Sequence, residues 1–383
     1  MIALLLAIAL ALQSGQRAPL TPAETLLEPA ILRAIAEQPL TAESAAQTAG
    51  TDGNAGWILL TCREGECGTA SRAARKLNAL VAAKKIPPPS RSIRVVSAIK
   101  ELKATAITAA IHVAESTDRP FQVVRGPWST ASIGDEIVDV FARHGGFAVE
   151  TRPFESLGQL PLDRLGIPTT TIVTNAWTSR DHAAATAAAA AYFLATLPND
   201  GAEALLSHLM VGAHARVAED GRRAVAQMGP SQRASADVLI LMGQAIDREQ
   251  RRIRSLARFM PSPLDPTLAS RLADMEKGVA SVWTSLGITS SPFVPPAERI
   301  RGRGGDDRRV PTPVAGATGT ADSAGLKLAN HADVAYEIVN FIDGKRTISD
   351  IRDAVMAEFG PVPLPAVARY LEALAKAGSL TIK

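Results

Sequence analysis

Four side chains that could hold a metal ion stand at the ends of apolar segments or close behind them. They are Cys62, Glu64, Glu101 and Glu115. Zinc takes thiolate, imidazole and carboxylate ligands, so these four groups could bind a single ion. A zinc-bound water is a nucleophile at neutral pH. One function that the sequence allows is therefore a metal-dependent hydrolase with its ligands at these positions.

The elements that must position these side chains alternate in type along the chain. Apolar segments rich in branched residues predict strands, and segments with apolar residues three and four apart predict helices. The strands are expected at residues 56–62, 92–99, 107–115, 121–126 and 166–175, and the helices at residues 70–85, 133–146 and 181–197. This alternation predicts an α/β domain with a mostly parallel sheet.

Three segments of this region are similar to one family of enzymes. They read ASRAARKLNALVAAKKIPPPSRSIRVV (Ala70–Val96), DRPFQVVRGPWS (Asp118–Ser129) and GIPTTTIVTNAWTSRD. In these segments the chain resembles the zinc-dependent exopeptidases of the aminopeptidase Y type (clan MH), over roughly Gly56–Leu197. The resemblance implies a three-layer α/β/α domain over residues 21–200 and a pair of catalytic zinc ions.

The resemblance also locates the ligands that such a zinc pair needs, and this chain lacks most of them. Cys62, Gly68, Ala114 and Trp177 stand where the family has ligands, and Lys100 or Glu101 falls near the catalytic Glu. Glycine, alanine, tryptophan and lysine side chains do not bind zinc well. The possible residual ligands are Glu64, Glu101 and Glu115. A tryptophan at position 177 would fill the volume left by a metal with an apolar ring.

The leading interpretation is therefore a pseudopeptidase, with no zinc or other cofactor, that binds a peptide or a protein. The retained TSRD (Thr178–Asp181) then has a structural role, in which Ser179 or Asp181 caps the following helix. The alternative is a metallo-aminopeptidase with a remodelled zinc site. A third possibility is a scaffold whose C-terminal part recruits a partner. The chain contains none of the motifs G-x-S-x-G, G-x-G-x-x-G or H-E-x-x-H.

The remaining two hundred residues divide into a helical appendage, a linker and a small domain. Residues 201–288 are helical in pattern, and Arg251, Arg252 and Arg254 are expected on a solvated face. Residues 289–330 are dense in Gly, Pro, Ser and Thr and are expected to form a linker.

Residues 331–383 predict three helices and a terminal strand, a winged-helix-like layout in which Thr347 or Ser349 caps the second helix. This part resembles the PqqD-like winged-helix domains, which bind peptides. From Asp333 to Lys383 it carries seven acidic and six basic residues, a balance that argues against nucleic acid as a partner. A peptide or protein partner is therefore expected for this domain.

The N-terminus and the two cysteines bear on where the protein works. Residues 1–20 contain an apolar run, Ile2–Leu12, and an A-x-A-like site, which together predict a signal peptide. An uncleaved membrane anchor is the alternative, and no other segment is expected to span a membrane. Export would place the protein in the periplasm or outside the cell. There Cys62 and Cys67 could form a disulfide or remain two thiols.

Overall fold

A seven-stranded sheet forms the centre of the N-terminal half. The computed structural model describes residues 47–48, 50, 56–98, 107–144, 149–159, 162–175, 178–197, 199–226, 236–260, 266, 269–274, 277, 306–315 and 319–383. The strand order is β1-β3-β2-β4-β7-β5-β6. The strands are β1 (Gln47–Thr48), β2 (Trp57–Thr61), β3 (Ser92–Val96), β4 (Ile107–Ser116), β5 (Gln122–Val124), β6 (Glu150–Arg152) and β7 (Thr169–Asn175). β3, β2, β4 and β7 are parallel, whereas β1 and β5 pair antiparallel to their neighbours β3 and β7.

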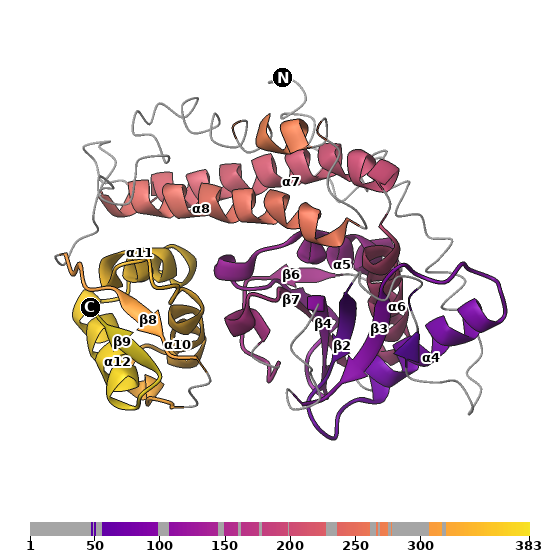
Figure 1. Ribbon diagram of the computed structural model, residues 1–383, viewed down its shortest axis with the longest axis horizontal. Coiled ribbons are helices and arrows are strands. Elements are labelled where there is room, and N and C mark those ends of the chain that lie inside the picture. Colours follow the sequence, from indigo (N-terminus) through magenta and orange to yellow (C-terminus); the bar gives the residue numbers. More distant parts are fainter. Residues whose placement is uncertain are drawn as a thin grey trace.

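Three helices cover one face of this sheet. They are α4 (Gly68–Ala82), α5 (Ile133–His144) and α6 (Arg180–Thr196), and α6 packs between the other two. The buried face of α6 consists mostly of alanine, which lets the helix lie close to the strands (Figure 1). The opposite face carries a small apolar cluster that includes Leu59 and Ala110, covered by the 3₁₀ helix η3 (Leu162–Leu165). The mixed α/β fold is thus confirmed, but the described residues place no helical layer of the expected three-layer kind on this second face.

Two strands, β6 and β1, are not predicted by the sequence patterns. β6 is three residues long and largely exposed, and β1 has only two residues. Neither carries the apolar alternation that predicts a strand, because each lies at an edge of the sheet with little to bury. β1 pairs with β3 and β6 with β5, and β6 is also held by a hydrogen bond from Gln122 to Glu150 (2.8 Å).

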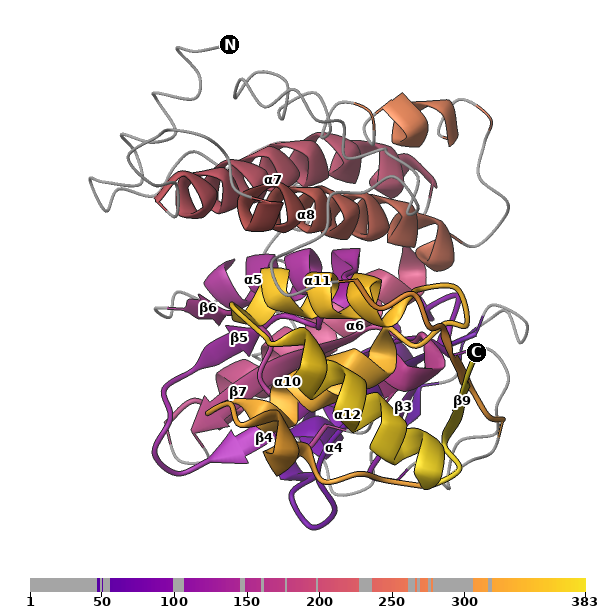
Figure 2. The same cartoon turned by 90° about the vertical axis from the view of Figure 1, so that its left-hand side faces the viewer.

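Two long antiparallel helices follow the sheet domain, α7 (Asn199–Ala226) and α8 (Ala236–Ser255). α8 contacts α5 on the sheet domain and also α11 (Ile348–Phe359) of the C-terminal part, so it bridges the two (Figures 1 and 2). The expectation of a solvated face around Arg252 is wrong. Its side chain is 2% exposed and pairs with Asp135 and Glu249, because the neighbouring elements enclose α8 on that side. Arg251 is half-buried and donates to the carbonyl of Trp128 (3.0 Å), and Arg254 alone of the three is exposed.

The C-terminal part contains three helices and a two-stranded antiparallel sheet. The helices are α10 (His331–Asn340), α11 (Ile348–Phe359) and α12 (Leu364–Lys376); the strands are β8 (Pro311–Pro313) and β9 (Leu380–Ile382). β8 lies within residues 289–330, which were expected to form a linker. The C-terminal part therefore begins before residue 331, at β8 or earlier. The prolines of β8 cannot donate, so the flanking Val310 and Val314 donate backbone hydrogen bonds to the carbonyls of Lys383 and Ser379, which flank β9. Thr347 caps α11 in a capping box with Asp350, whereas Ser349 accepts from the backbone N–H of Asp307.

The C-terminal part docks on the sheet domain through carboxylates. Glu337 of α10 accepts from the backbone N–H and the hydroxyl of Ser129, both at 2.7 Å. Glu358 of α11 accepts from the N–H of Trp128 (3.2 Å). Trp128 and Ser129 open the 3₁₀ helix η2 (Trp128–Thr130), whose first N–H groups have no partner within the helix. The hydroxyl of Tyr336 donates to Asp163 of η3 (2.9 Å).

Neither the predicted signal peptide nor a membrane anchor is tested by this fold. Residues 1–20 lie outside the described residues. None of the described helices combines the length and the apolar composition that a bilayer crossing requires. Signal cleavage and export therefore stay predictions.

Candidate functional site

The candidate site lies where β2, β4 and β7 end. These strands are parallel, so their carboxyl ends meet at one edge of the sheet. α4 begins after β2, and α6 begins after β7. The amino ends of both helices therefore point at the end of β4, where Glu115 lies opposite Thr174 of β7 in the strand register. This is the edge to which the resemblance assigns the zinc ligands.

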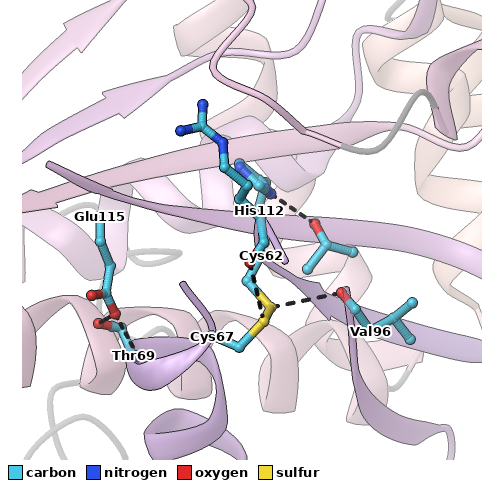
Figure 3. The surroundings of a disulfide bond; sticks show 8 residues. Cys62, Cys67, Thr69, Val96, His112 and Glu115 are labelled. Atoms are coloured by element: carbon cyan, nitrogen blue, oxygen red, sulfur yellow. Dashed lines mark hydrogen bonds between the residues drawn. A yellow bond between two sulfur atoms is a disulfide. The ribbon is translucent and has the colours of Figure 1, made fainter. Parts of the chain in front are cut away.

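Cys62 and Cys67 form a disulfide at this edge. Cys62 is fully buried directly after β2, and Cys67 directly precedes α4 (Figure 3). The bridge decides between the two alternatives that the sequence leaves open. A disulfide sulfur is not a thiolate, and metal binding by cysteine requires the thiolate. Cys62 is thus removed from the set of candidate ligands.

Glu115 is fully engaged by the two neighbouring helices. Its Oε1 accepts from the backbone N–H (2.8 Å) and the hydroxyl (2.6 Å) of Thr69, in the first turn of α4 (Figure 3). Its Oε2 accepts from Arg180 at the start of α6 (2.8 Å). Burial by itself would raise the pKa of Glu115, but these hydrogen bonds and the charge of Arg180 outweigh it and lower the pKa. The carboxylate is ionised and joins the two helices.

Gly68 leaves the space that Glu115 occupies. A Cβ atom at position 68 would lie 3.2 Å from Oε1 of Glu115 and 3.8 Å from Nη2 of Arg180. An aspartate here would place a second carboxylate against Glu115, which is costly without a cation between the two. The structure thus brings Gly68, a position that the resemblance assigns to a ligand, next to Glu115, a possible residual ligand. Ala114 points to the opposite face of the sheet from Glu115, because side chains alternate along a strand.

The other predicted ligands do not join this arrangement. Glu64 is exposed in the turn between the two cysteines. Glu101, Lys100 and Trp177 lie outside the described residues. Within the described ranges no three His, Cys, Asp or Glu side chains are grouped as a metal site requires. With one candidate in a disulfide and another occupied by Thr69 and Arg180, the donors among the described residues do not fit zinc.

The TSRD segment ties elements together, but not by the helix cap that the sequence predicts. Ser179 occupies the N-cap position of α6 without accepting from the helix. Its hydroxyl instead bonds to Thr174 (2.9 Å) and accepts from the N–H of Asn175 (2.9 Å), both on β7. Asp181 pairs with Arg72 of α4. The segment therefore fixes α6 against β7 and α4.

His112 is buried on the opposite face of β4. Its Nδ1 lies 3.2 Å from the hydroxyl of Thr61 on β2, and its side chain is fully buried. Burial lowers the pKa of His112 to about 4, so the imidazole is neutral at pH 7. A buried, neutral histidine with a hydroxyl partner is a structural residue here.

A second location, which the sequence patterns do not indicate, contains a cavity. Its volume is about 330 Å³, and it lies where the end of β5, α7, α8 and α11 meet. Five arginines line it: Arg125, Arg216, Arg223, Arg248 and Arg252. Four of them come from the two helices of the appendage. The sequence signal was the density of arginine in the appendage, but nothing local shows which of these side chains face inward.

The comparisons with known proteins add little to this geometry. No family model matches the chain, and no curated protein matches it. Among solved structures, the chain is similar to a "putative peptidase" from Clostridium acetobutylicum, at 10% identity and a TM-score of 0.24. That match covers 88% of this chain and 59% of the other, so this chain spans less than two thirds of its length. A likeness this weak establishes neither an enzyme family nor an activity.

Proposed function

We propose that this chain is an exported pseudopeptidase: a protein with an aminopeptidase-like sheet domain that binds a peptide or a protein and does not cleave it. One observation carries the proposal. At the edge where the resemblance expects zinc, Glu115 and Cys62 are both held in structural bonds. A carboxylate that already accepts three hydrogen bonds and lies beside Arg180 would have to lose them to bind a metal.

The electrostatics of the edge support the same conclusion. A pair of zinc ions needs several carboxylate and imidazole ligands, one of them bridging both ions. Here the positive partners of Glu115 are the amino end of α4 and the guanidinium of Arg180. These groups stand in for the charge that a metal would supply. The edge is therefore stable without any ion.

The disulfide supports export, because such bonds form and persist in oxidising compartments. The resemblance of residues 331–383 to PqqD-like winged-helix domains supports a peptide as the partner. The C-terminal part uses Glu337, Glu358 and Tyr336 to dock on the sheet domain. A partner would bind to the faces that this docking leaves open, or at the sheet edge.

The runner-up function is a metallo-aminopeptidase with a remodelled site. It would use Glu64, Glu101 and Glu115 without Cys62. The experiment that separates the two measures zinc, manganese and cobalt in the purified mature protein after dialysis, and again after each ion is added. Aminopeptidase activity is assayed on the same samples with amino-acid anilides.

We expect no stoichiometric metal and no metal-dependent cleavage. The matched variants are Glu115→Gln and Glu219→Gln, the second of which alters an exposed carboxylate on α7. Stoichiometric zinc that Glu115→Gln abolishes and Glu219→Gln retains would refute the pseudopeptidase and establish the runner-up.

A further inference from the structure

The cavity between the sheet domain, the appendage and the C-terminal part has an unbalanced charge. Arg216 pairs with Glu136 and Glu249, and Arg248 pairs with Asp220 and Glu249. Arg252 pairs with Asp135 and Glu249, and Arg223 pairs with Asp220. Four carboxylates thus neutralise four of the five arginines that line the cavity.

Arg125 is the fifth, and it has no such partner. Its guanidinium forms no ion pair and no side-chain hydrogen bond with the described residues, although its backbone N–H bonds to Arg152. Burial, and then the positive charges of Arg252 and Arg216, lower the pKa of Arg125 against the weaker attraction of Glu136 and Asp135, yet a guanidinium stays charged in proteins. Its side chain is partly exposed and lines the cavity, so the guanidinium is open to a ligand.

The acidic residues on the cavity wall do not supply the missing charge. Glu219 is engaged by Arg222 on the outer face of α7. Burial and the neighbouring Glu337 raise the pKa of Glu358 well above its ordinary value, which favours its protonated form. A protonated carboxyl adds no negative charge to the cavity wall.

Apolar side chains complete the wall. Trp128, Pro153 and Phe154 line the cavity beside the arginines, and the guanidinium of Arg248 lies 4.4 Å from the centre of the Trp128 ring. A cavity of about 330 Å³ is at the lower end of the range for small-molecule sites. It combines one free planar cation with an aromatic surface.

We propose that this cavity binds a monocarboxylate that carries an apolar group. The carboxylate would form a bidentate pair with Arg125, since a guanidinium presents two parallel N–H donors to such a group. The apolar group would pack against Trp128 and Phe154. One missing negative charge fits a carboxylate better than a phosphate, which carries up to two. The carboxylate has two possible sources, the C-terminus of a peptide and a free organic acid.

The binding test uses the full chain and isothermal titration calorimetry with three probes. They are N-acetyl-Ala-Phe with a free carboxylate, the same compound as its C-terminal amide, and 3-phenylpropionate. We expect the acid to bind and the amide to bind at least tenfold more weakly. Tighter binding of the peptide acid than of phenylpropionate identifies a peptide C-terminus as the source, and equal binding identifies an organic acid.

Arg125→Gln should weaken binding of the acid at least tenfold, because it removes the charge that pairs with the carboxylate. Arg125→Lys keeps the charge but loses the bidentate geometry, and it should give an intermediate loss. The control is Arg143→Gln, on an exposed arginine of α5 that pairs with Asp139 away from the cavity. It should change the affinity less than twofold.

A second readout does not need a ligand. Arg125 is repelled by Arg252 and Arg216, so Arg125→Gln should not lower the melting temperature below that of the unsubstituted chain. A structural arginine would show the opposite. Equal binding of acid and amide, no binding of any probe at millimolar concentration, or a lowered melting temperature of Arg125→Gln would each overturn the proposal.

Discussion

Replacing Glu249 by glutamine removes the charge on which the buried arginines of the appendage depend. The side chain of Glu249 is 0% exposed and accepts from Arg216 (2.9 Å), Arg248 (2.6 Å) and Arg252 (2.8 Å). These charges hold the pKa of Glu249 well below its ordinary value, against the effect of burial. Each arginine retains one other carboxylate after the substitution. The glutamine amide, however, would bring its own donors against three guanidinium groups.

The expected loss of stability is large. Removing one partner of a buried ion pair costs about 3–5 kcal/mol, a substantial part of the roughly 5–15 kcal/mol that a folded domain has in total. With a urea dependence of about 3 kcal/mol per molar, the unfolding midpoint should fall by roughly 1–1.7 M. Tryptophan fluorescence and far-UV circular dichroism would both follow the transition.

The control for this prediction is Glu219→Gln, the same substitution in an exposed ion pair with Arg222 on α7. Exposed pairs contribute less than about 1 kcal/mol, so the midpoint should change little. The pH dependence of stability provides a second check. The pKa of Glu249 is lower in the folded chain than in the unfolded chain, so its carboxylate stabilises the fold above the unfolded pKa. That stabilisation is lost as the pH falls through the folded pKa. Glu249→Gln should therefore be less sensitive to acid than the unsubstituted chain. Midpoints that shift equally in the two variants would refute the reasoning.

Three further predictions concern other parts of the chain. Cys67→Ser should destabilise the chain by about 2 kcal/mol, because the disulfide closes a short loop of sequence separation 5. In a urea titration with added dithiothreitol, only the unsubstituted chain should lose stability. Glu115→Ala should lower the free energy of unfolding by about 1–3 kcal/mol, since it leaves Thr69 and Arg180 without their partner. Zinc uptake, measured by elemental analysis, should not change. A variant as stable as the unsubstituted chain would contradict the structural role of Glu115. Burial raises the pKa of Glu337, and burial together with the charge of Glu337 raises the pKa of Glu358, so the docking that they stabilise when protonated should weaken as the pH rises above about 4.5. Hydrogen-exchange protection factors in α10 and α11, which correct for the faster intrinsic exchange at high pH, should then be lower at pH 8 than at pH 5. Glu358→Gln should show no such drop, and equal protection factors in the unsubstituted chain would contradict this.

The alternation of strands and helices was predictable because it depends on local patterns. Apolar runs such as WILLT and TTTIVTN are buried strands, and the helices between them begin and end close to their predicted limits. β8 was not predictable in the same way, since its two prolines resemble a linker. It forms a strand because Val310 and Val314 supply the hydrogen bonds that the prolines cannot. That pairing depends on β9, seventy residues away.

The candidate site was predictable in position but not in its bonding. The resemblance assigns a ligand position to Ala114, whereas the side chain that lies against Gly68 is that of its neighbour Glu115. What Glu115 binds there depends on Thr69 and Arg180, which belong to two different helices. The burial of Arg252 likewise depends on Asp135, more than a hundred residues earlier. Charge patterns along one helix cannot show which face another element will cover.

The two locations differ in how their charges are balanced, and this difference indicates where a ligand should be sought. At the sheet edge Glu115 has Arg180 and Asp181 has Arg72, so a ligand there would have to displace an existing partner. In the cavity Arg125 has no ion-pair partner among the described residues. A ligand that supplies one negative charge there would displace no carboxylate from it. Affinity should therefore be strongest at the junction of the three parts, even if the sheet edge has lost its chemistry.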